Sequence, residues 1–394
     1  MKIAVLSHFY PPEPCAAATR VASLAQALGN AGHDVTVVTN FPSFPSGAFA
    51  PPDRLRTMRV ERDAHARVVR LCSIAARGIP AGRLVHWASS ALAAILYLST
   101  TRERYDTIVV SMPPITLAVP ALLGAWRHRA RLVVDVRDVF PDIAIAMGEW
   151  RSDGFLARAS ERLVRQLYAR ANLIVAVTPT ALAQIATRGV EPARLLLARN
   201  AAEDASVIPS EHRSRSGFTA IYAGNLGLAT DLDVLVDAAT LVDGDNITIE
   251  IVGDGAQRAH LNERIKNEGV RNIVVKSSVP REDAMRLVAG ADVSIVPLRK
   301  GIRESVPTKL YDSLAVGTPV IIAADGEGKT EGESLGAVCT AAGDAPALAN
   351  ALRTLRALDR VSLREMGDRA KARVHSRGDR AGIMASLAGR ISAL

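Results

Sequence analysis

A loop, a helix and a buried strand follow one another in the segment Arg303-Glu-Ser-Val-Pro-Thr-Lys-Leu-Tyr-Asp-Ser-Leu-Ala-Val-Gly-Thr-Pro-Val-Ile321. A helix that starts near Val306 places Glu304 in the loop at its positive end and Asp312 two turns along it. Lys309 and the free N–H groups of the first turn can then hold an anion, while the carboxylates accept hydrogen bonds from hydroxyl groups. An anion flanked by hydroxyls describes a nucleotide-activated sugar. The alternative is a surface helix with ordinary i, i+3 charges.

Short apolar runs alternate with helical patterns along the whole chain of 394 residues. In the first half we expect strands at Ile3–Ser7, Val35–Thr39, Val68–Leu71, Thr107–Ser111, Leu132–Val136, Leu173–Val177 and Leu195–Ala198. In the second half we expect strands at Phe218–Tyr222, Ile247–Val252, Ile273–Val275, Val293–Pro297, Val320–Ala323 and Ala337–Thr340. Apolar strands separated by helices indicate parallel sheets that are covered on both faces.

The alternation breaks once, at a polar segment from Ala202 to Ser216 that is a good linker candidate. The sequence therefore predicts an α/β protein with two doubly wound, Rossmann-like domains that face each other across a cleft. We expect the first domain at residues 1–203, with 378–394 crossing back onto it as a helix. The second domain, at 204–377, then contains the segment that begins at Arg303.

Composition excludes several classes of protein. The hydrophobic share of 48% with 22% charge is that of a folded globular protein. Three cysteines without a close pair exclude a disulfide scaffold or a zinc finger, and we expect neither a metal nor another cofactor. The net charge of +8 comes with only 4% aromatic residues, which disfavours nucleic acid as a partner. An anionic membrane surface is a better candidate, and a solvated basic face without a partner is the alternative.

An uncharged stretch, Leu84–Thr101, follows an arginine and precedes another. Its apolar residues recur at helical spacing and predict one stripe along a helix. The stripe consists of Leu84, Trp87, Ala91, Ile95 and Leu98. Three interpretations stay open for this helix: it is buried in the core, it lies in a membrane interface, or it spans a membrane.

Two candidate sites follow strands of the first domain. Cys15, Ala16 and Ala17 stand in the loop and helix start after the first strand, where small residues let backbone N–H groups approach an anion. The loop has no dinucleotide-binding glycine pattern, and a plain strand–helix connection is the alternative. At the end of a later strand stand Asp135, Arg137 and Asp138; we expect Arg137 or Asp138 to face the reacting centre. Alternatively, Arg137 neutralises one of the two carboxylates.

Glycines follow two strands of the second domain. Gly224, with Asn225 behind it, comes after the first strand, and Gly253 comes after the next. Glycine at the carboxyl end of a strand permits close backbone contact with a nucleotide, although each glycine also suits a tight turn. Both fall on the same predicted sheet edge as Glu304 and Lys309, and this convergence favours a single site.

Together these residues resemble the family 4 retaining glycosyltransferases of the GT-B fold, and most of all the bacterial branch that builds polysaccharide and capsule units, the L-fucosamine transferase type. The resemblance covers nearly the whole chain. It is carried by the segments Phe9–Glu13, Ala18–Val21, Gly32–Val37, Phe41–Gly47, Val136–Pro141, Tyr222–Gly224, Val252–Gly255, Ala291–Val293 and Val306–Asp312. It implies a nucleoside diphosphate sugar, expected to be a UDP-sugar, as donor.

The resemblance also implies residue roles. Glu304 and Asp312 occupy the acidic positions of the family's E-x7-E motif, with Glu304 near the donor sugar and Asp312 at the ribose. Arg303 and Lys309 would face the diphosphate, which the loop at Cys15, Ala16 and Ala17 would approach from the other domain. The other residues expected to bind the donor are Gly224, Asn225, Gly253, Ser305 and Leu310. Catalysis would fall to Glu304, Arg137 and Asp138.

Three positions depart from the family pattern. Asp312 is one methylene shorter than the usual glutamate, and Cys15 replaces a frequent glycine. Asn225 belongs to the segment after Gly224 in which many family members carry two basic residues for the diphosphate. The implied reaction is metal-independent transfer with retention to a hydroxyl acceptor, expected to be a lipid-linked glycan. We expect the protein on the cytoplasmic face of the membrane, attached peripherally. The alternatives are a soluble acceptor or an inactive protein that binds nucleotide sugars.

Overall fold

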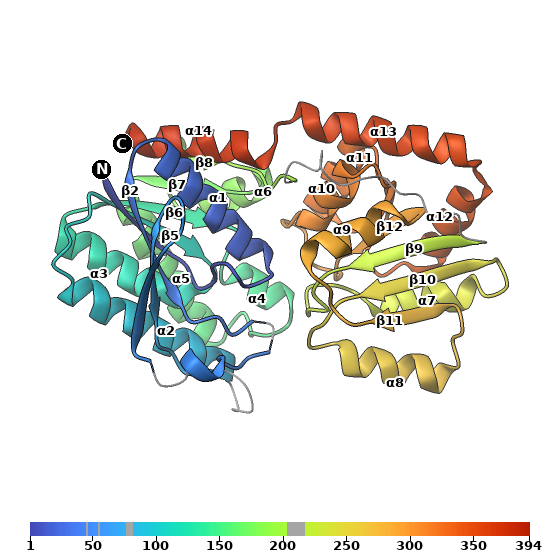
Figure 1. Ribbon diagram of the computed structural model, residues 1–394, viewed down its shortest axis with the longest axis horizontal. Coiled ribbons are helices and arrows are strands. Elements are labelled where there is room, and N and C mark those ends of the chain that lie inside the picture. The colour runs from blue at the N-terminus through green and yellow to red at the C-terminus, as the bar shows by residue number, and fades with distance from the viewer. Residues whose placement is uncertain (45, 54–55, 76–81, 203–216) are drawn as a thin grey trace. The chain divides into compact units, whose positions relative to one another are not determined.

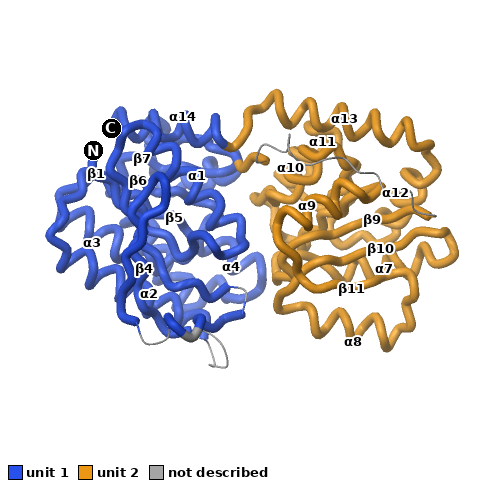
Figure 2. Tube along the Cα trace, viewed as in Figure 1, with its two compact units in different colours: residues 1–199, 381–394 blue, residues 200–380 orange. Residues whose placement is uncertain are grey.

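The computed structural model describes residues 1–44, 46–53, 56–75, 82–202 and 217–394. The chain forms two compact units, which Figure 2 shows in separate colours. Unit 1 contains residues 1–199 and 381–394, and unit 2 contains residues 200–380. The division thus falls close to the predicted boundaries at 203 and 378. The predicted linker lies, apart from its first residue, outside the described residues.

Unit 1 is built on a sheet of eight strands in the order β3-β4-β2-β1-β5-β6-β7-β8 (Figure 1). Seven strands run parallel to one another: β1 Lys2–Leu6, β2 Asp34–Asn40, β4 Arg67–Leu71, β5 Thr107–Met112, β6 Arg131–Val136, β7 Leu173–Ala176 and β8 Leu195–Leu197. Because these strands are apolar, their positions agree closely with the sequence-based expectation.

One strand was not expected. β3, Met58–Arg62, pairs antiparallel with β4 at the edge of the sheet. Its residues alternate between exposed and half-buried side chains, so it lacks the continuous apolar run of the other strands. The expectation of a purely parallel sheet was therefore wrong at this edge.

The helices of unit 1 connect successive strands and cover the sheet. They are α1 Ala16–Asn30, α2 Gly82–Thr100, α3 Ala118–His128, α4 Asp142–Ala146, α5 Phe155–Arg170 and α6 Pro179–Ala186, followed at the end of the chain by α14 Arg380–Ser392. α14 joins the core of this unit through Met384, Leu387 and Ile391, each at most 1% exposed, which pack in one cluster with α1. At about 1.5–3 kcal/mol per buried side chain, these contacts anchor the C-terminal segment firmly.

Unit 2 has a six-stranded parallel sheet in the order β11-β10-β9-β12-β13-β14. Its strands are β9 Phe218–Ala223, β10 Ile247–Val252, β11 Ile273–Lys276, β12 Val293–Pro297, β13 Val320–Ala323 and β14 Val338–Thr340. Successive residues of β9 enter different cores: Ala220 and Tyr222 lie in one apolar cluster and Ile221 in the other. Both faces of this sheet are thus covered, as the apolar runs predict.

The helices of unit 2 complete the alternation. They are α7 Asp233–Leu241, α8 Arg258–Glu268, α9 Arg281–Ala289, α10 Thr308–Ala315, α11 Gly326–Leu335, α12 Ala345–Ala357 and α13 Arg360–Ser376. α10 belongs to the segment from Arg303 to Ile321 and leads into β13. The loop, helix and strand expected there are all present.

The uncharged stretch from Leu84 forms α2, and its apolar stripe lies against protein. Ala91 and Leu98 are buried, and the ring of Trp87 meets that of Phe140 at 6.3 Å between centroids. Leu84 and Ile95 are half-buried. Of the three interpretations of this helix, the one in which it packs in the protein core agrees with these contacts. Among the residues that the structure describes, no helix is long and apolar enough to cross a membrane.

Candidate functional site

The candidate donor site of unit 2 lies where three neighbouring parallel strands end. β10, β9 and β12 are adjacent, so the segments after them meet at one sheet edge. Lys309 of α10 lies across the loop that follows β9: a Cβ atom added to Gly224 would overlap the Lys309 side chain. The Lys309 ammonium also stands 5.3 Å from the ring centre of Tyr222. The structure thus brings Gly224 and Lys309 together, 85 positions apart in the chain.

Gly253 has a structural explanation. A Cβ atom at this position would overlap the carbonyl oxygen of Gly224, and the Gly224 N–H donates to the carbonyl of Val252 at 2.8 Å. The loops after β9 and β10 therefore pack backbone against backbone. The glycine at 253 is required by this packing, whatever the loop binds.

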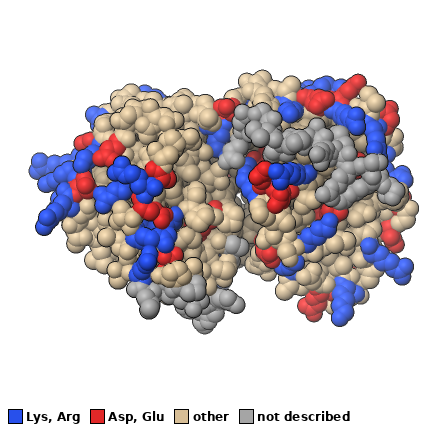
Figure 3. Space-filling model, viewed as in Figure 1, with Lys and Arg blue, Asp and Glu red and all other residues tan. Residues whose placement is uncertain are grey.

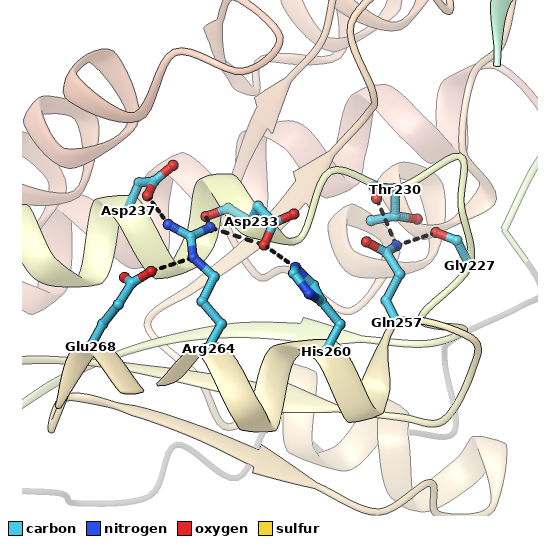
Figure 4. Close-up of polar contacts among 8 residues, drawn as sticks. All are labelled: Gly227, Thr230, Asp233, Asp237, Gln257, His260, Arg264 and Glu268. Carbon is cyan, nitrogen blue, oxygen red and sulfur yellow. Dashed lines mark hydrogen bonds and ion pairs between the residues drawn. The ribbon is translucent and has the colours of Figure 1, made fainter. Parts of the chain in front are cut away.

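A glutamine that the sequence interpretation missed fixes the loop after β9. The Gln257 side-chain amide donates to the carbonyl oxygens of Gly227 at 2.6 Å and Thr230 at 2.9 Å (Figure 4). The Gln257 backbone N–H donates to Leu226. Gln257 directly precedes α8, so the position of the loop depends on the position of that helix. The sequence offered no signal for this role except that Gln257 follows a glycine-rich turn.

α8 is itself tied to α7 by ion pairs, which Figure 4 shows around one arginine. Arg264 of α8 binds Asp233 at 2.9 Å and Asp237, both of α7, and within α8 it also binds Glu268 at 2.7 Å. His260 adds a contact of 2.9 Å to Asp233. These groups are mostly exposed, so each pair stabilises little by itself. Together these ion pairs fix the position of α8 relative to α7, and therefore also the position of Gln257 at the start of α8.

The loop before α10 holds Glu304 in place. Glu304 is 7% exposed, and its Oε2 accepts the backbone N–H of Arg303 at 3.2 Å. The carbonyl of Arg303 accepts the N–H of Glu327 at 2.7 Å, where α11 begins. A Cβ on Gly326 would overlap that same carbonyl. The start of α11 therefore fixes the backbone from which Glu304 projects, while the Arg303 side chain is exposed.

Two other predicted residues of this segment differ in burial. Ser305 is half-buried, whereas Leu310 is fully buried in an apolar core cluster of unit 2. The Leu310 side chain serves the core, so only its backbone is left for contact with a ligand. Asn225, in the loop after β9, is exposed, and its carbonyl oxygen accepts the Tyr222 hydroxyl at 2.5 Å.

Asp312, the second acid of the motif, is bound by arginine. Arg281 at the start of α9 donates to both carboxylate oxygens, at 3.0 and 3.3 Å. The Arg380 guanidinium lies 3.9 Å from the same carboxylate. Asp312 is 8% exposed, so these charges compensate its removal from water. The sequence interpretation missed both arginines, because neither stands near Asp312 in the chain.

In unit 1, Asp135 has a structural role. It is 1% exposed and receives three hydrogen bonds of 2.7–3.2 Å from Arg20 of α1, which is also buried. Arg20 donates in addition to the carbonyl of Ala198. The hydrogen-bond partner of Asp135 is thus Arg20, while Arg137 adds the electrostatic influence of a second positive charge.

Arg137 and Asp138 follow β6 and are half-buried. Arg137 donates to the hydroxyl of Ser111 at 3.2 Å and to the carbonyl of Pro113 at 2.7 Å, so it is fastened to the end of β5. Burial lowers the pKa of Arg137, against the pull of neighbouring carboxylates. Burial also raises the pKa of Asp138, and the charge of Arg137 only partly opposes this. A carboxyl group with a raised pKa is suited to proton transfer.

The loop from Cys15 to Ala17 lies at the start of α1. Cys15 has extended backbone and precedes the first turn, which Ala16 and Ala17 begin. Burial raises the pKa of the Cys15 thiol. The loop is held by Glu13, whose carboxylate accepts the backbone N–H groups of Ser43 at 3.1 Å, Phe44 at 3.0 Å and Tyr10 at 3.3 Å. This carboxylate anchors the loop and was not singled out from the sequence.

A second feature that was missed is His8, which follows β1. It is 3% exposed and lies 3.0 Å from the Asn40 amide and 3.3 Å from the Ser90 hydroxyl. Burial, together with His86 and Arg137, lowers the pKa of His8 to about 3. A neutral, hydrogen-bonded histidine therefore stands at the same sheet edge as the other candidate residues of unit 1.

Comparison with known families identifies the class. Residues 16–201 match the glycosyl transferase 4-like domain, and residues 217–357 match the glycosyl transferases group 1. The two matches support a glycosyltransferase with one domain of each type.

Among named relatives, WcaI of Escherichia coli (strain K12), described as a colanic acid biosynthesis glycosyl transferase, is 23% identical over 82% of this chain and 84% of its own length. The glycosyltransferase WbjE of Pseudomonas aeruginosa is 22% identical over 57% of this chain and 58% of its own. The chain is thus similar to glycosyltransferases of bacterial polysaccharide synthesis.

Solved structures define the fold. Sucrose-phosphate synthase from Thermosynechococcus elongatus superposes with a TM-score of 0.78 at 18% identity, covering 100% of this chain and 98% of that one. HepE of Anabaena, in complex with UDP and glucose, gives 0.73 at 16% identity with full coverage of both chains. WaaG, a glycosyltransferase involved in lipopolysaccharide biosynthesis, gives 0.70 at 16% identity and 99% coverage of each chain. The fold is GT-B, as predicted; the cleft between the two domains stays a prediction.

Within the described part of the chain, no group of three or more His, Cys, Asp or Glu side chains is arranged to hold a metal ion. Metal independence stays a prediction.

Proposed function

We propose that this glycosyltransferase moves a sugar from a nucleoside diphosphate sugar, with UDP as the expected nucleotide, to a hydroxyl group with retention at the anomeric carbon. The observation that carries the proposal is Lys309, which lies against Gly224 at the sheet edge where Glu304 is buried. An ammonium beside a glycine loop suits a diphosphate, and the adjacent acid suits sugar hydroxyls. HepE, which has the same fold, was crystallised with UDP-glucose, and this supports the choice of nucleotide.

The chemistry follows from the charges. The bond between the anomeric carbon and the diphosphate breaks, and negative charge develops on the leaving phosphate oxygen. Lys309, with Arg303 in the loop before the same helix, stabilises that charge. The acceptor hydroxyl attacks the same face and gives its proton to the leaving phosphate, assisted by Asp138, whose raised pKa makes it a stronger base. Glu304 orients the sugar.

We further propose a lipid-linked glycan as acceptor, on the cytoplasmic face of a membrane to which the protein attaches peripherally. The similarity to WcaI and the net charge of +8 support this choice. A soluble acceptor is the second candidate. An inactive protein that only binds nucleotide sugars is a third candidate, but the chain contains Asp138 and Arg137 as well as a complete donor segment, and this argues against it.

The test starts with a panel of UDP-, GDP- and dTDP-sugars in thermal-shift assays, followed by donor hydrolysis and transfer with the one that binds. The anomeric configuration of the product, determined by NMR, checks retention. Glu304→Gln should lower turnover by roughly two orders of magnitude while the protein stays folded, because the acid that orients the donor sugar is neutralised. Near-wild-type turnover would remove Glu304 from the site, and inversion would refute the mechanism.

A further inference from the structure

The side of unit 1 covered by α2, α3 and α5 exposes large apolar side chains. Leu92 and Leu96 of α2 are 58% and 57% exposed, and Trp126 of α3 is 75% exposed. At the start of α5, Phe155 is 83% exposed. Leu123 and Leu156 are exposed to a smaller extent. Soluble proteins scatter such residues singly, whereas several on adjoining helices mark an interaction surface.

These helices form one layer. α3 packs between α2 and α5. α2 and α3 run alongside each other, because Thr116 donates to the carbonyl of Trp87 at one end, and the His128 ring lies 3.0 Å from the carbonyl of Leu98 at the other. Leu92 lies one turn from Leu96, so the two share a helix face. The exposed apolar side chains of these adjoining helices form one surface, here called the outer helix surface. It consists of Leu92, Leu96, Leu123, Trp126, Phe155 and Leu156.

The charge on the outer helix surface is positive. α3 contains Arg127, and the sequences of α2 and α3 contain no aspartate or glutamate, although Arg83 at the start of α2 is already paired with Glu149. α5 carries Arg158, Arg162, Arg165 and Arg170 against the single acid Glu161. That acid is already bound by Arg165 at 2.7 Å and by Arg188 at 3.0 Å. Figure 3 likewise shows Lys and Arg side chains standing out at the outer edge of unit 1.

We infer that the outer helix surface docks on an anionic phospholipid bilayer. The inference rests on the proposed lipid-linked acceptor and names the surface that would bring the enzyme to it. Leucine and phenylalanine side chains enter the acyl boundary, tryptophan prefers the interface, and guanidinium groups bind lipid phosphates. This surface differs from the stripe expected from the sequence, since Trp87 packs against Phe140 while Leu92, Leu96 and Trp126 point outward.

The test is flotation of the full chain with vesicles of phosphatidylcholine containing one third phosphatidylglycerol. Leu92→Ser, Leu96→Ser and Trp126→Ser, combined, should lower the partition coefficient by about tenfold or more. The matched control replaces Leu358 and Val361, exposed apolar residues of unit 2, by serine and should bind as wild type. Circular dichroism and UDP affinity should stay unchanged in both variants, because no substituted side chain is buried.

A second variant tests the charge. Arg127→Glu with Arg158→Glu should weaken binding to anionic vesicles by about fivefold or more for each arginine, and wild-type binding should fall with salt. Equal binding by wild type, serine and glutamate variants would overturn the inference, as would equal binding to pure phosphatidylcholine. If the wild type ignores vesicles but forms a dimer that the serine variant loses, the surface is a protein interface instead. Intact UDP binding in that case would leave the proposed reaction standing.

Discussion

The buried ion pair between Arg20 and Asp135 gives the sharpest test of the division between structural and reactive charges in unit 1. Asp135 is 1% exposed and Arg20 is 5% exposed, and three hydrogen bonds of 2.7–3.2 Å join them. Asp135→Asn keeps the shape of the side chain but removes its charge. The Arg20 guanidinium then stays buried without a counter-ion, beside the neutral carbonyl of Ala198.

The expected cost is large. Removing one partner of a buried, hydrogen-bonded ion pair costs about 3–5 kcal/mol, because the remaining charge is desolvated without compensation. For a domain of about 200 residues, each kcal/mol lowers the melting temperature by about 2–4 °C. The transition of unit 1 should therefore fall by about 6–20 °C. The double variant Arg20→Met with Asp135→Leu should recover much of this loss, since it leaves no buried charge.

The assay is calorimetry of the full chain, with urea unfolding followed by circular dichroism. The matched control is Arg151→Ala, which removes an ion pair with Asp153 whose side chains are 84% and 61% exposed. An exposed pair of this kind contributes little, so the control should melt within about 2 °C of wild type. If Asp135→Asn melts like the control but has lost activity, Asp135 belongs to the reaction, and its assignment as a structural residue is refuted.

Three further outcomes follow from the site geometry. Lys309→Ala and Arg303→Ala should each weaken UDP binding by about 1.5–3 kcal/mol in calorimetric titration, because a charge-assisted bond to the diphosphate is lost; unchanged affinity in both would place the anion elsewhere. Gln257→Ala should release the loop after β9 and weaken UDP binding by about tenfold with a small change in melting temperature; an unaltered affinity would show that the loop does not carry the nucleotide. The pKa of His8, lowered by burial to about 3, lies below the ordinary value of about 6.5, so its stabilisation is complete above pH 6.5 and is lost as the pH falls towards 3. Between pH 7 and 5 wild type should lose about 2 kcal/mol more stability than His8→Gln in urea titrations; parallel curves would contradict a neutral buried imidazole.

The fold was largely predictable because its information is local. Buried parallel strands are continuous apolar runs, and almost every such run became a strand. The strand β3 was not predicted because Met58–Arg62 alternates between exposed and half-buried residues and carries three charges. This pattern also suits a loop. The role of α2 could not be predicted for another reason. Helical spacing shows that Trp87 and Leu98 share a face, but it does not show whether that face meets protein or lipid.

The donor site was predictable in part. Gly224 directly follows β9, and Glu304 and Lys309 lie in the loop and the helix that follow β12, so the sequence places them at one edge without knowledge of side-chain contacts. Gln257 could not be found in this way, because its importance lies in two hydrogen bonds to carbonyl oxygens of a loop about 30 residues earlier. Similarly, the sequence shows that Asp135 ends a buried strand, but only the structure shows that Arg20 neutralises it.

Asp312 shows that a family motif alone is insufficient to assign the role of a residue, because the motif does not show which other side chains bind that residue. The motif predicts an acid at this position, and the structure has one. Its carboxylate, however, already accepts two hydrogen bonds from Arg281 and lies 3.9 Å from Arg380. Any hydroxyl group that Asp312 binds must share it with these guanidinium groups. Glutamate is one methylene longer than aspartate. At position 312 this extra length would move the carboxylate out of its two hydrogen bonds with Arg281, which is a larger effect than the change in how far the side chain reaches. The chemistry at position 312 therefore depends on the ion pair between Asp312 and Arg281, and the sequence motif does not contain Arg281.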